Sequence, residues 1–302
     1  MNEWKESWGK KNMAKEIPAD KFVWVRSIFG KGPHAREQYN HIPDGGVNQQ
    51  IKDWHVKQDD RVIKCASPSN LVRCPRSVWF EVNGYNYINK MNWGTKQRLL
   101  LGRLAENLFA EQFKDNGILL KHWQDDPGVE VDKFSYGEGV DYIEGVPDYM
   151  LKLGDVVAVS DAKTSRSDSF GYNPIEFDEL IKDFNWYKYK VQLDAYFYLL
   201  INNKDRLQEM NLPIPTHSHL FSYALDDGIV RREYLWETTK QDLKNVQRLI
   251  RIQNQAIKSS TMPDCTCSEG EMKFCKYAVI AKGKKVGESC CDINIMKQGE
   301  LL

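Results

Sequence analysis

The spacing of apolar residues predicts three long helices. In residues 96–117, side chains at intervals of three and four share one helical face, and Asn116-Gly117 marks the end of that helix. The shared face holds Leu99, Gly102, Glu106, Phe109 and Phe113. Two further long helices are predicted over about 176–200 and 239–258, and a short Ser-capped helix is predicted to run into Cys74.

Between the helices, apolar and polar residues follow strand patterns. Strands are predicted near 119–123, within 139–153 and over 155–164, with a turn at Gly154-Asp155. A hairpin is predicted over 217–237. The order of helix, strands, helix, strands, helix predicts an α/β fold with a central mixed β-sheet flanked by helices.

Residues 1–65 contain Gly-Pro and Pro-Asp-Gly-Gly but few periodic stretches, so we predict an irregular N-terminal extension there. Residues 66–302 are predicted to form one domain. The 302-residue chain is 41% hydrophobic and 28% charged, a composition that favours a folded protein. Its longest apolar run, 195–201, is far short of the ~20 residues of a membrane span. No apolar signal core is seen at the start, so we expect a cytoplasmic protein without membrane contact.

Acidic and basic residues cancel, at 42 each, but they are segregated along the chain. Residues 119–161 carry ten acids against three lysines, whereas residues 1–36 carry eight Lys or Arg against four acids. An acidic centre with basic flanks favours a cation site that serves an anionic polymer. Ordinary solvated faces would explain the same pattern.

Three carboxylates and one lysine carry the candidate chemistry. Glu106 lies on the apolar face of its helix, where an ionised carboxylate is costly unless it has a partner. Asp148 follows Pro147 at the start of one strand, and the next strand ends in Asp161-Ala162-Lys163. Because side chains alternate along a strand, Asp161 and Lys163 share a face and can converge with Asp148. Such oxygen ligands suit Mg²⁺ or Mn²⁺, with Lys163 placed to position or deprotonate an attacking water.

These residues form an ordered set of four motifs that resembles the PD-(D/E)xK nuclease superfamily, in its RecB-like branch. The motifs are Gly102-x-x-x-Glu106, Gly145-Val146-Pro147-Asp148, Asp161-Ala162-Lys163, and Gln192-Leu193-Asp194-Ala195-Tyr196. The resemblance implies a restriction-endonuclease-like core, metal ligation by Glu106, Asp148 and Asp161, and catalytic roles for Lys163, Gln192 and Tyr196. Many RecB-like members have histidine in place of Glu106, so the choice between Mg²⁺ and Mn²⁺ stays open. Asp161 stands where glutamate is commoner, which is an accepted variant in the superfamily.

Seven cysteines, an odd number, argue against a disulfide framework. The sequence resembles AddB-type nucleases and CRISPR-associated RecB-like exonucleases, in which one early and three late cysteines hold a [4Fe-4S] cluster. The resemblance implies cluster ligation here by Cys74, Cys267, Cys275 and Cys290, with Cys265 and Cys291 as close competitors. The late cysteines, within about 259–292, are spaced irregularly for that family. Zinc held by four thiolates, or free buried thiols, fit the same residues.

We therefore expect a metal-dependent DNA nuclease, with exonuclease action on single strands or duplex ends implied by the resemblance alone. Protein partners in recombination, replication or defence complexes fit that family. Residues 182–190 combine lysines and aromatic rings that suit phosphate contact and base stacking, or core packing. The alternatives are a non-catalytic DNA-binding or assembly protein that keeps the nuclease fold, and a zinc module with structural carboxylates.

Overall fold

The computed structural model describes residues 63–84, 93–123, 133–165, 175–224 and 229–266. The chain divides into two units, Met1–Asp60 and Arg61–Leu302, and every described residue belongs to the second. The predicted N-terminal extension thus lies almost wholly outside the described residues, and its boundary at residue 65 stays a prediction.

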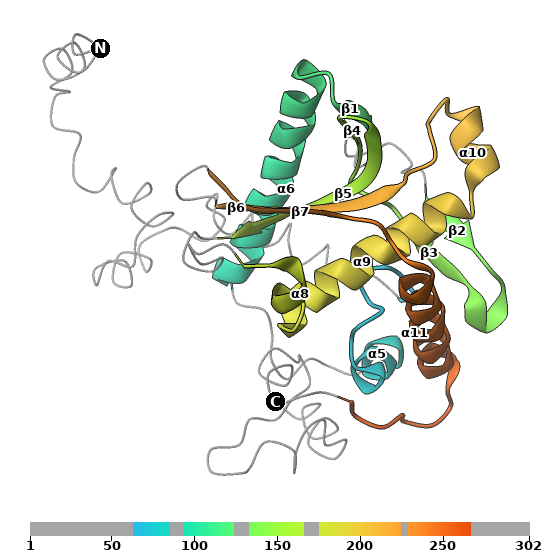
Figure 1. The fold of residues 1–302 in the computed structure, drawn as a ribbon. Helices are drawn as coiled ribbons and strands as arrows, with labels where there is room; N and C mark the ends of the chain where they lie inside the picture. Colours follow the sequence, from blue (N-terminus) through green and yellow to red (C-terminus); the bar gives the residue numbers. More distant parts are fainter. Residues whose placement is uncertain (1–62, 85–92, 124–132, 166–174, 225–228, 267–302) are drawn as a thin grey trace, which may run out of the picture. The chain divides into compact units, whose positions relative to one another are not determined.

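The described part of the second unit contains a five-stranded mixed sheet (Figure 1). Its strand order is β1 (Leu119–His122), β4 (Tyr149–Leu153), β5 (Val156–Ser165), β6 (His217–Ala224) and β7 (Ile229–Trp236). All neighbours pair antiparallel except β5 and β6, which are parallel. A parallel pair needs a crossover connection, and here the chain between β5 and β6 supplies it with helices. A separate hairpin joins β2 (Phe134–Tyr136) to β3 (Ile143–Gly145).

Helices cover both faces of the sheet. The described helices are α5 (Pro75–Val82), α6 (Trp93–Asp115), α8 (Phe177–Leu180), α9 (Phe184–Ile201), α10 (Lys204–Glu209) and α11 (Lys240–Lys258), with a short 3-10 helix η2 (Gly139–Asp141). Figure 1 shows α6 and α9 on opposite sides of the sheet, and α5 beside α11. The predicted α/β fold with a mixed sheet flanked by helices is confirmed.

Alternating side chains of the strands build a core on each face. Tyr149, Leu151, Ala162 and Phe221 pack with Phe109 on the α6 side. The intervening residues pack with α9 in the larger core, among them Met150, Val159 and Leu220. This strict alternation decides which face of the sheet each polar residue of β4 and β5 joins.

Within the described ranges, no helix combines the length and the apolar character needed to span a bilayer.

Two helix predictions were wrong in detail. The helix predicted over 176–200 is interrupted, because the Asp183 carboxylate caps a new helix by accepting a hydrogen bond from the Asn185 main-chain N–H at 2.9 Å. The short helix begins after Cys74 instead of running into it. Pro75 explains this start, since proline suits the first turn of a helix, where its missing N–H costs nothing.

Candidate active site

Asp148 and Asp161 form a buried carboxylate pair across two neighbouring strands. β4 and β5 pair antiparallel with Tyr149 opposite Ser160, and continuing that register by one residue brings Asp148 opposite Asp161. Directly opposed residues on such strands have their Cβ atoms about 4.5–5.5 Å apart. Only 6% of Asp148 and 1% of Asp161 is exposed. The structure therefore brings these two predicted site residues together in a place that solvent barely reaches.

Lys163 points to the same side of β5 as Asp161. Its ammonium forms an ion pair with the Asp161 carboxylate. The same ammonium donates a hydrogen bond to Gln192 Oε1 at 3.4 Å and lies 4.9 Å from the centre of the Tyr189 ring. These contacts hold the lysine between β5 and α9, beside the carboxylate pair.

Gln192 and Tyr196 continue the site along α9. They are four residues apart, so they lie one turn above the other on one helical face. Gln192 Nε2 donates to the Tyr196 hydroxyl at 3.4 Å, while Gln192 Oε1 accepts from Lys163. The predicted Gln-x-x-x-Tyr element thus contacts the predicted Asp-x-Lys element directly.

Glu106 reaches the site from α6, on the other side of the sheet. The Tyr149 hydroxyl donates to the main-chain carbonyl of Glu106 at 2.7 Å, which fixes this turn of α6 against β4. One turn earlier, a Cβ on Gly102 would lie 2.8 Å from Thr164 Oγ1, so glycine permits the close approach of α6 to β5. The Glu106 carboxylate interacts electrostatically with Asp148 and Tyr196.

Burial and charge shift the protonation of the cluster. Burial, and then the neighbouring Asp161 carboxylate, raise the pKa of Asp148 well above its usual range. For Lys163, burial favours the neutral amine, but Asp161 and Asp148 outweigh it and the pKa of the lysine is raised. Lys163 is therefore an ammonium at neutral pH. Burial first, and then Asp148 and Asp161, also raise the pKa of the Tyr196 hydroxyl.

The donor set fits a hard divalent cation. Three carboxylates and one ammonium carry a formal charge of −2, which one divalent ion would neutralise, and carboxylate oxygens are the ligands that Mg²⁺ and Mn²⁺ prefer. In the part of the chain that the structure describes, however, no three His, Cys, Asp or Glu side chains are already arranged to hold a metal ion. The predicted ligands thus form a buried aspartate pair with Glu106 as an electrostatic neighbour.

The predicted thiol ligands are described only in part. Cys74, the residue before α5, is buried, and its sulfur lies 3.8 Å from the Cys265 sulfur. α5 packs on α11, and Trp79 Nε1 donates to the Ser259 carbonyl at 2.9 Å, so the chain after α11 returns along α5. Among the described residues, Cys265, one of the two competitors, thus contacts Cys74. The other predicted ligands lie outside the described residues: Cys267, Cys275 and Cys290.

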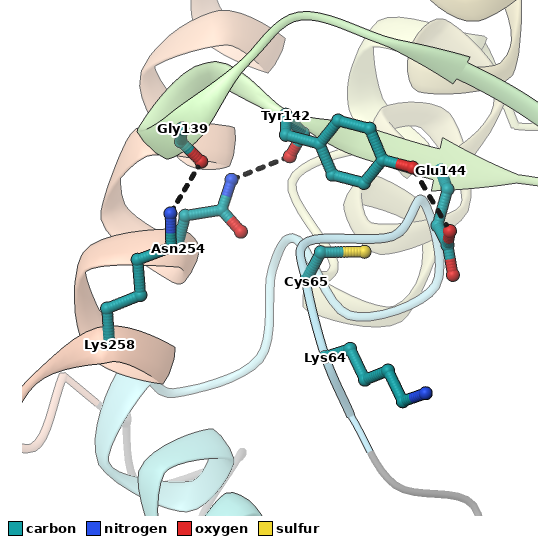
Figure 2. A pocket seen from close by; sticks show the side chains of 7 residues that line it. All are labelled: Lys64, Cys65, Gly139, Tyr142, Glu144, Asn254 and Lys258. Carbon is teal, nitrogen blue, oxygen red and sulfur yellow. Dashed lines mark hydrogen bonds between the residues drawn. The ribbon is translucent and has the colours of Figure 1, made fainter.

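A hollow of about 390 Å³ lies apart from the aspartate pair, between the β2–β3 hairpin and α11 (Figure 2). Cys65 lines it together with Tyr142 and Glu144, and the Tyr142 hydroxyl donates to Glu144 Oε2 at 3.3 Å. Burial, and then the Glu144 carboxylate, raise the pKa of the Cys65 thiol to about 11. Cys65 is thus a protonated thiol at neutral pH.

Asp194, inside the Gln-x-x-x-Tyr element, has a structural role. Its carboxylate accepts hydrogen bonds from Lys190 at 2.7 Å, from Trp236 Nε1 at 3.0 Å and from Thr238 Oγ1 at 3.0 Å. Lys190 also donates to Asp242 on α11 at 2.6 Å. This network ties α9 to β7 and α11, which keeps the helix that carries Gln192 in place.

The aromatic residues of 182–190 serve mainly the core. Trp186 is buried and packs edge-on against Tyr189 and Tyr234, and Tyr187 packs at the edge of the same core. Sequence reasoning missed Tyr149, which anchors α6, and it named the lysines of 182–190 for phosphate contact without singling out Lys188. Helical spacing does single it out, because Lys188 lies one turn before Gln192 and so belongs on the same face of α9.

Comparison with known proteins adds no assignment. No family model and no curated protein matches the chain. A solved structure described as "Crystal structure of SSO0001" has 19% sequence identity and a TM-score of 0.44, with the match covering 79% of this chain and 96% of that chain. A similarity of this size carries no argument about function.

Proposed function

We propose that the protein is a metal-dependent DNA nuclease that hydrolyses phosphodiester bonds on single strands or duplex ends. One observation carries the proposal: Asp148 lies opposite Asp161 on neighbouring strands, and Lys163 pairs with Asp161 on the same face. Perturbed titratable groups that gather from separate elements are typical of catalytic sites. The order of the four motifs along the chain, which resembles the RecB-like branch, favours phosphodiester hydrolysis over other carboxylate chemistry.

Asp148, Asp161 and Glu106 would hold Mg²⁺ or Mn²⁺. The ion, when bound, supplies Lewis-acid polarisation of a phosphoryl oxygen and neutralises the charge of the three carboxylates. Burial strengthens the attraction between the ion and the carboxylates, because little water is present there to screen their charges. Burial, and then the Asp161 carboxylate, raise the pKa of Asp148, and a cation between the two carboxylates would offset both effects.

Lys163 acts in this proposal as a fixed positive charge. Its raised pKa keeps it protonated at neutral pH, so it donates hydrogen bonds to the attacking water or to the phosphoryl oxygens as negative charge develops there. Gln192 and the Tyr189 ring hold the ammonium in position. Tyr196 orients Gln192 and, with its raised pKa, stays a neutral hydroxyl.

A non-catalytic protein that keeps the nuclease fold is the rival. It is favoured by the lack, within the described ranges, of three ligands already arranged around a metal position. Cleavage itself separates the two functions. The test uses end-labelled single-stranded, duplex and circular DNA with Mn²⁺, and compares the wild type with Asp161→Asn.

The proposal expects wild-type protein to degrade linear DNA and Asp161→Asn to be inactive. If the protein degrades linear DNA and leaves circular DNA intact, it acts at DNA ends. DNA bound but never cleaved under any divalent cation would support the rival and overturn the proposal.

A further inference from the structure

Lys188 is a half-buried cation beside the catalytic cluster. It lies on α9 one turn before Gln192, so Lys188, Gln192 and Tyr196 share one face of the helix. Gln192 hydrogen-bonds Lys163, and Lys188 itself lies close enough to Lys163 for their charges to repel. The Lys188 side chain thus borders the place where the substrate phosphate would lie.

Arg73 approaches the same place from the segment before α5. Its guanidinium interacts electrostatically with Lys188, and its main-chain carbonyl accepts a hydrogen bond from Gln253 of α11 at 2.5 Å. The next residue, Cys74, makes the thiol contact with Cys265. Arg73 is therefore held by the packing of α5 on α11, independently of the sheet.

The three cations differ in their partners. Lys163 pairs with Asp161, and Arg73 pairs with Glu81 at 2.5 Å. Lys188 has no carboxylate within ion-pair or hydrogen-bond distance among the residues that the structure describes. Burial, and then the charges of Lys163 and Arg73, lower the pKa of Lys188. A partly buried ammonium with two other cations nearby is unfavourable by itself and is stabilised by an anion.

We propose that Lys188, with Arg73 beside it, binds a phosphate of the nucleic-acid strand next to the scissile linkage. The inference rests on the proposed function, since it assigns the anion to the nuclease's own substrate. Cations that contact a phosphate supply affinity and register, and do not take part in bond cleavage. Lys188 is accordingly a positioning residue. Its removal acts on substrate binding, whereas removal of Lys163 acts on the chemical step.

The test compares Lys188→Met with Lys182→Met, which removes the same charge from an exposed lysine that pairs with Glu179. Binding of a fluorescent single-stranded oligonucleotide is measured by anisotropy with Ca²⁺ in place of Mg²⁺. Lys188→Met is expected to weaken binding about tenfold and to lower the salt slope by about one. It should raise KM with kcat changed by less than about threefold. Lys188→Arg should restore most of the affinity, and Lys182→Met should behave as wild type.

A phosphate walk identifies the contact. Each oligonucleotide in a series carries one neutral methylphosphonate, placed at a different linkage. Wild type should bind more weakly when the linkage that Lys188 contacts is neutral. The affinity of Lys188→Met should not change when that linkage is neutral. Oligonucleotides with and without a 5′-terminal phosphate tell an internal linkage from a strand end, and either source supports the site. If wild type cleaves DNA but Lys188→Met matches Lys182→Met at every linkage, the phosphate site is wrong and the nuclease proposal stands. If wild type neither binds nor cleaves nucleic acid, both are wrong.

Discussion

Asp148 and Asp161 face each other across the β4–β5 pair, each almost fully buried, with the Lys163 ammonium against Asp161. Two like charges in this position oppose folding unless a proton or a cation separates them. Structural stability alone would favour apolar residues here. The proposed metal site would account for the pair, since a divalent cation between the two carboxylates would offset their repulsion.

Removal of the Lys163 charge should abolish cleavage. Lys163→Met keeps the apolar stem but removes the donor that would stabilise developing phosphoryl charge, so we expect a loss of about 10²–10⁴-fold in kcat. Lys152→Met, on the exposed side of β4, removes an equal charge and serves as the control. Both variants are checked for secondary structure by circular dichroism. A folded Lys163→Met enzyme with wild-type turnover would contradict the assignment.

Asp148→Asn should stabilise the metal-free protein while inactivating it. The pKa of Asp148 is raised in the folded state, so folding takes up a proton, and the stability present at pH values below its usual pKa is lost as pH rises through the folded value. The asparagine side chain of Asp148→Asn does not ionise, so the variant does not lose this stability as pH rises. We expect its thermal midpoint at pH 8 with EDTA to exceed that of wild type by about 2–4 °C, equivalent to ~1 kcal/mol.

Added Mn²⁺ should reverse that order, because it stabilises only the protein that binds it. Differential scanning fluorimetry across pH 4 to 9, with EDTA or Mn²⁺, makes the comparison. Asp194→Asn serves as the contrast, since that carboxylate accepts three hydrogen bonds in the network with Lys190, and its amide should destabilise the fold. An Asp148→Asn protein less stable than wild type in EDTA would mean that the carboxylate is structural.

Gly102→Ala should displace α6 from the site. The new Cβ would lie 2.8 Å from Thr164 Oγ1, closer than packed atoms allow, so the helix that carries Glu106 must shift. Overpacking of this kind costs about 1–3 kcal/mol, partly offset by the higher helix propensity of alanine. The double variant Gly102→Ala with Thr164→Ala removes the clash and should recover stability and activity. If Gly102→Ala lowers stability and activity equally in the wild-type and Thr164→Ala backgrounds, the steric explanation is wrong.

The two described thiol environments should differ in metal content. Cys265→Ser, which changes the sulfur beside Cys74, should lower the iron or zinc content of anaerobically purified protein. Cys65→Ser should not. Metal analysis with a visible spectrum distinguishes the two metals, since an iron-sulfur cluster absorbs broadly near the blue end and zinc does not. Full metal content in Cys265→Ser would exclude that cysteine as a ligand.

The reactivity of Cys65 supplies an independent measure of pH dependence. The pKa of its thiol is raised to about 11, so the reactive thiolate is scarce at pH 8 and its fraction rises about tenfold per pH unit up to that value. Alkylation of Cys65 by iodoacetamide, followed by mass spectrometry of its peptide, should show this profile. A plateau below pH 9 would show that the thiol is not buried as described.

Much of this fold follows from local patterns. The apolar stripe of α6 and the alternation in β4 and β5 predicted which face Glu106, Asp161 and Lys163 would join, because helix and strand periodicity depend only on backbone geometry. The register of Asp148 against Asp161 also followed, since the tight turn at Gly154-Asp155 joins the two strands. The approach of Gln192 to Lys163 came only from the motif resemblance.

The rest depends on contacts between distant segments. The break before α9 is made by the Asp183 cap, which competes with an otherwise continuous apolar pattern. Spacing alone did not predict the contact between Cys74 and Cys265, because the path of the chain after α11 is set by its packing on α5. Lys188 and Arg73 are 115 residues apart in sequence, and no local pattern brings them together.

Isothermal titration calorimetry of Mn²⁺ binding to the metal-free protein tests the carboxylate cluster most directly. We expect saturable Mn²⁺ binding by wild type, retained in Lys188→Met and lost in Asp161→Asn. Undiminished Mn²⁺ binding by Asp161→Asn would show that the ion binds elsewhere, and the nuclease assignment of this cluster would fail.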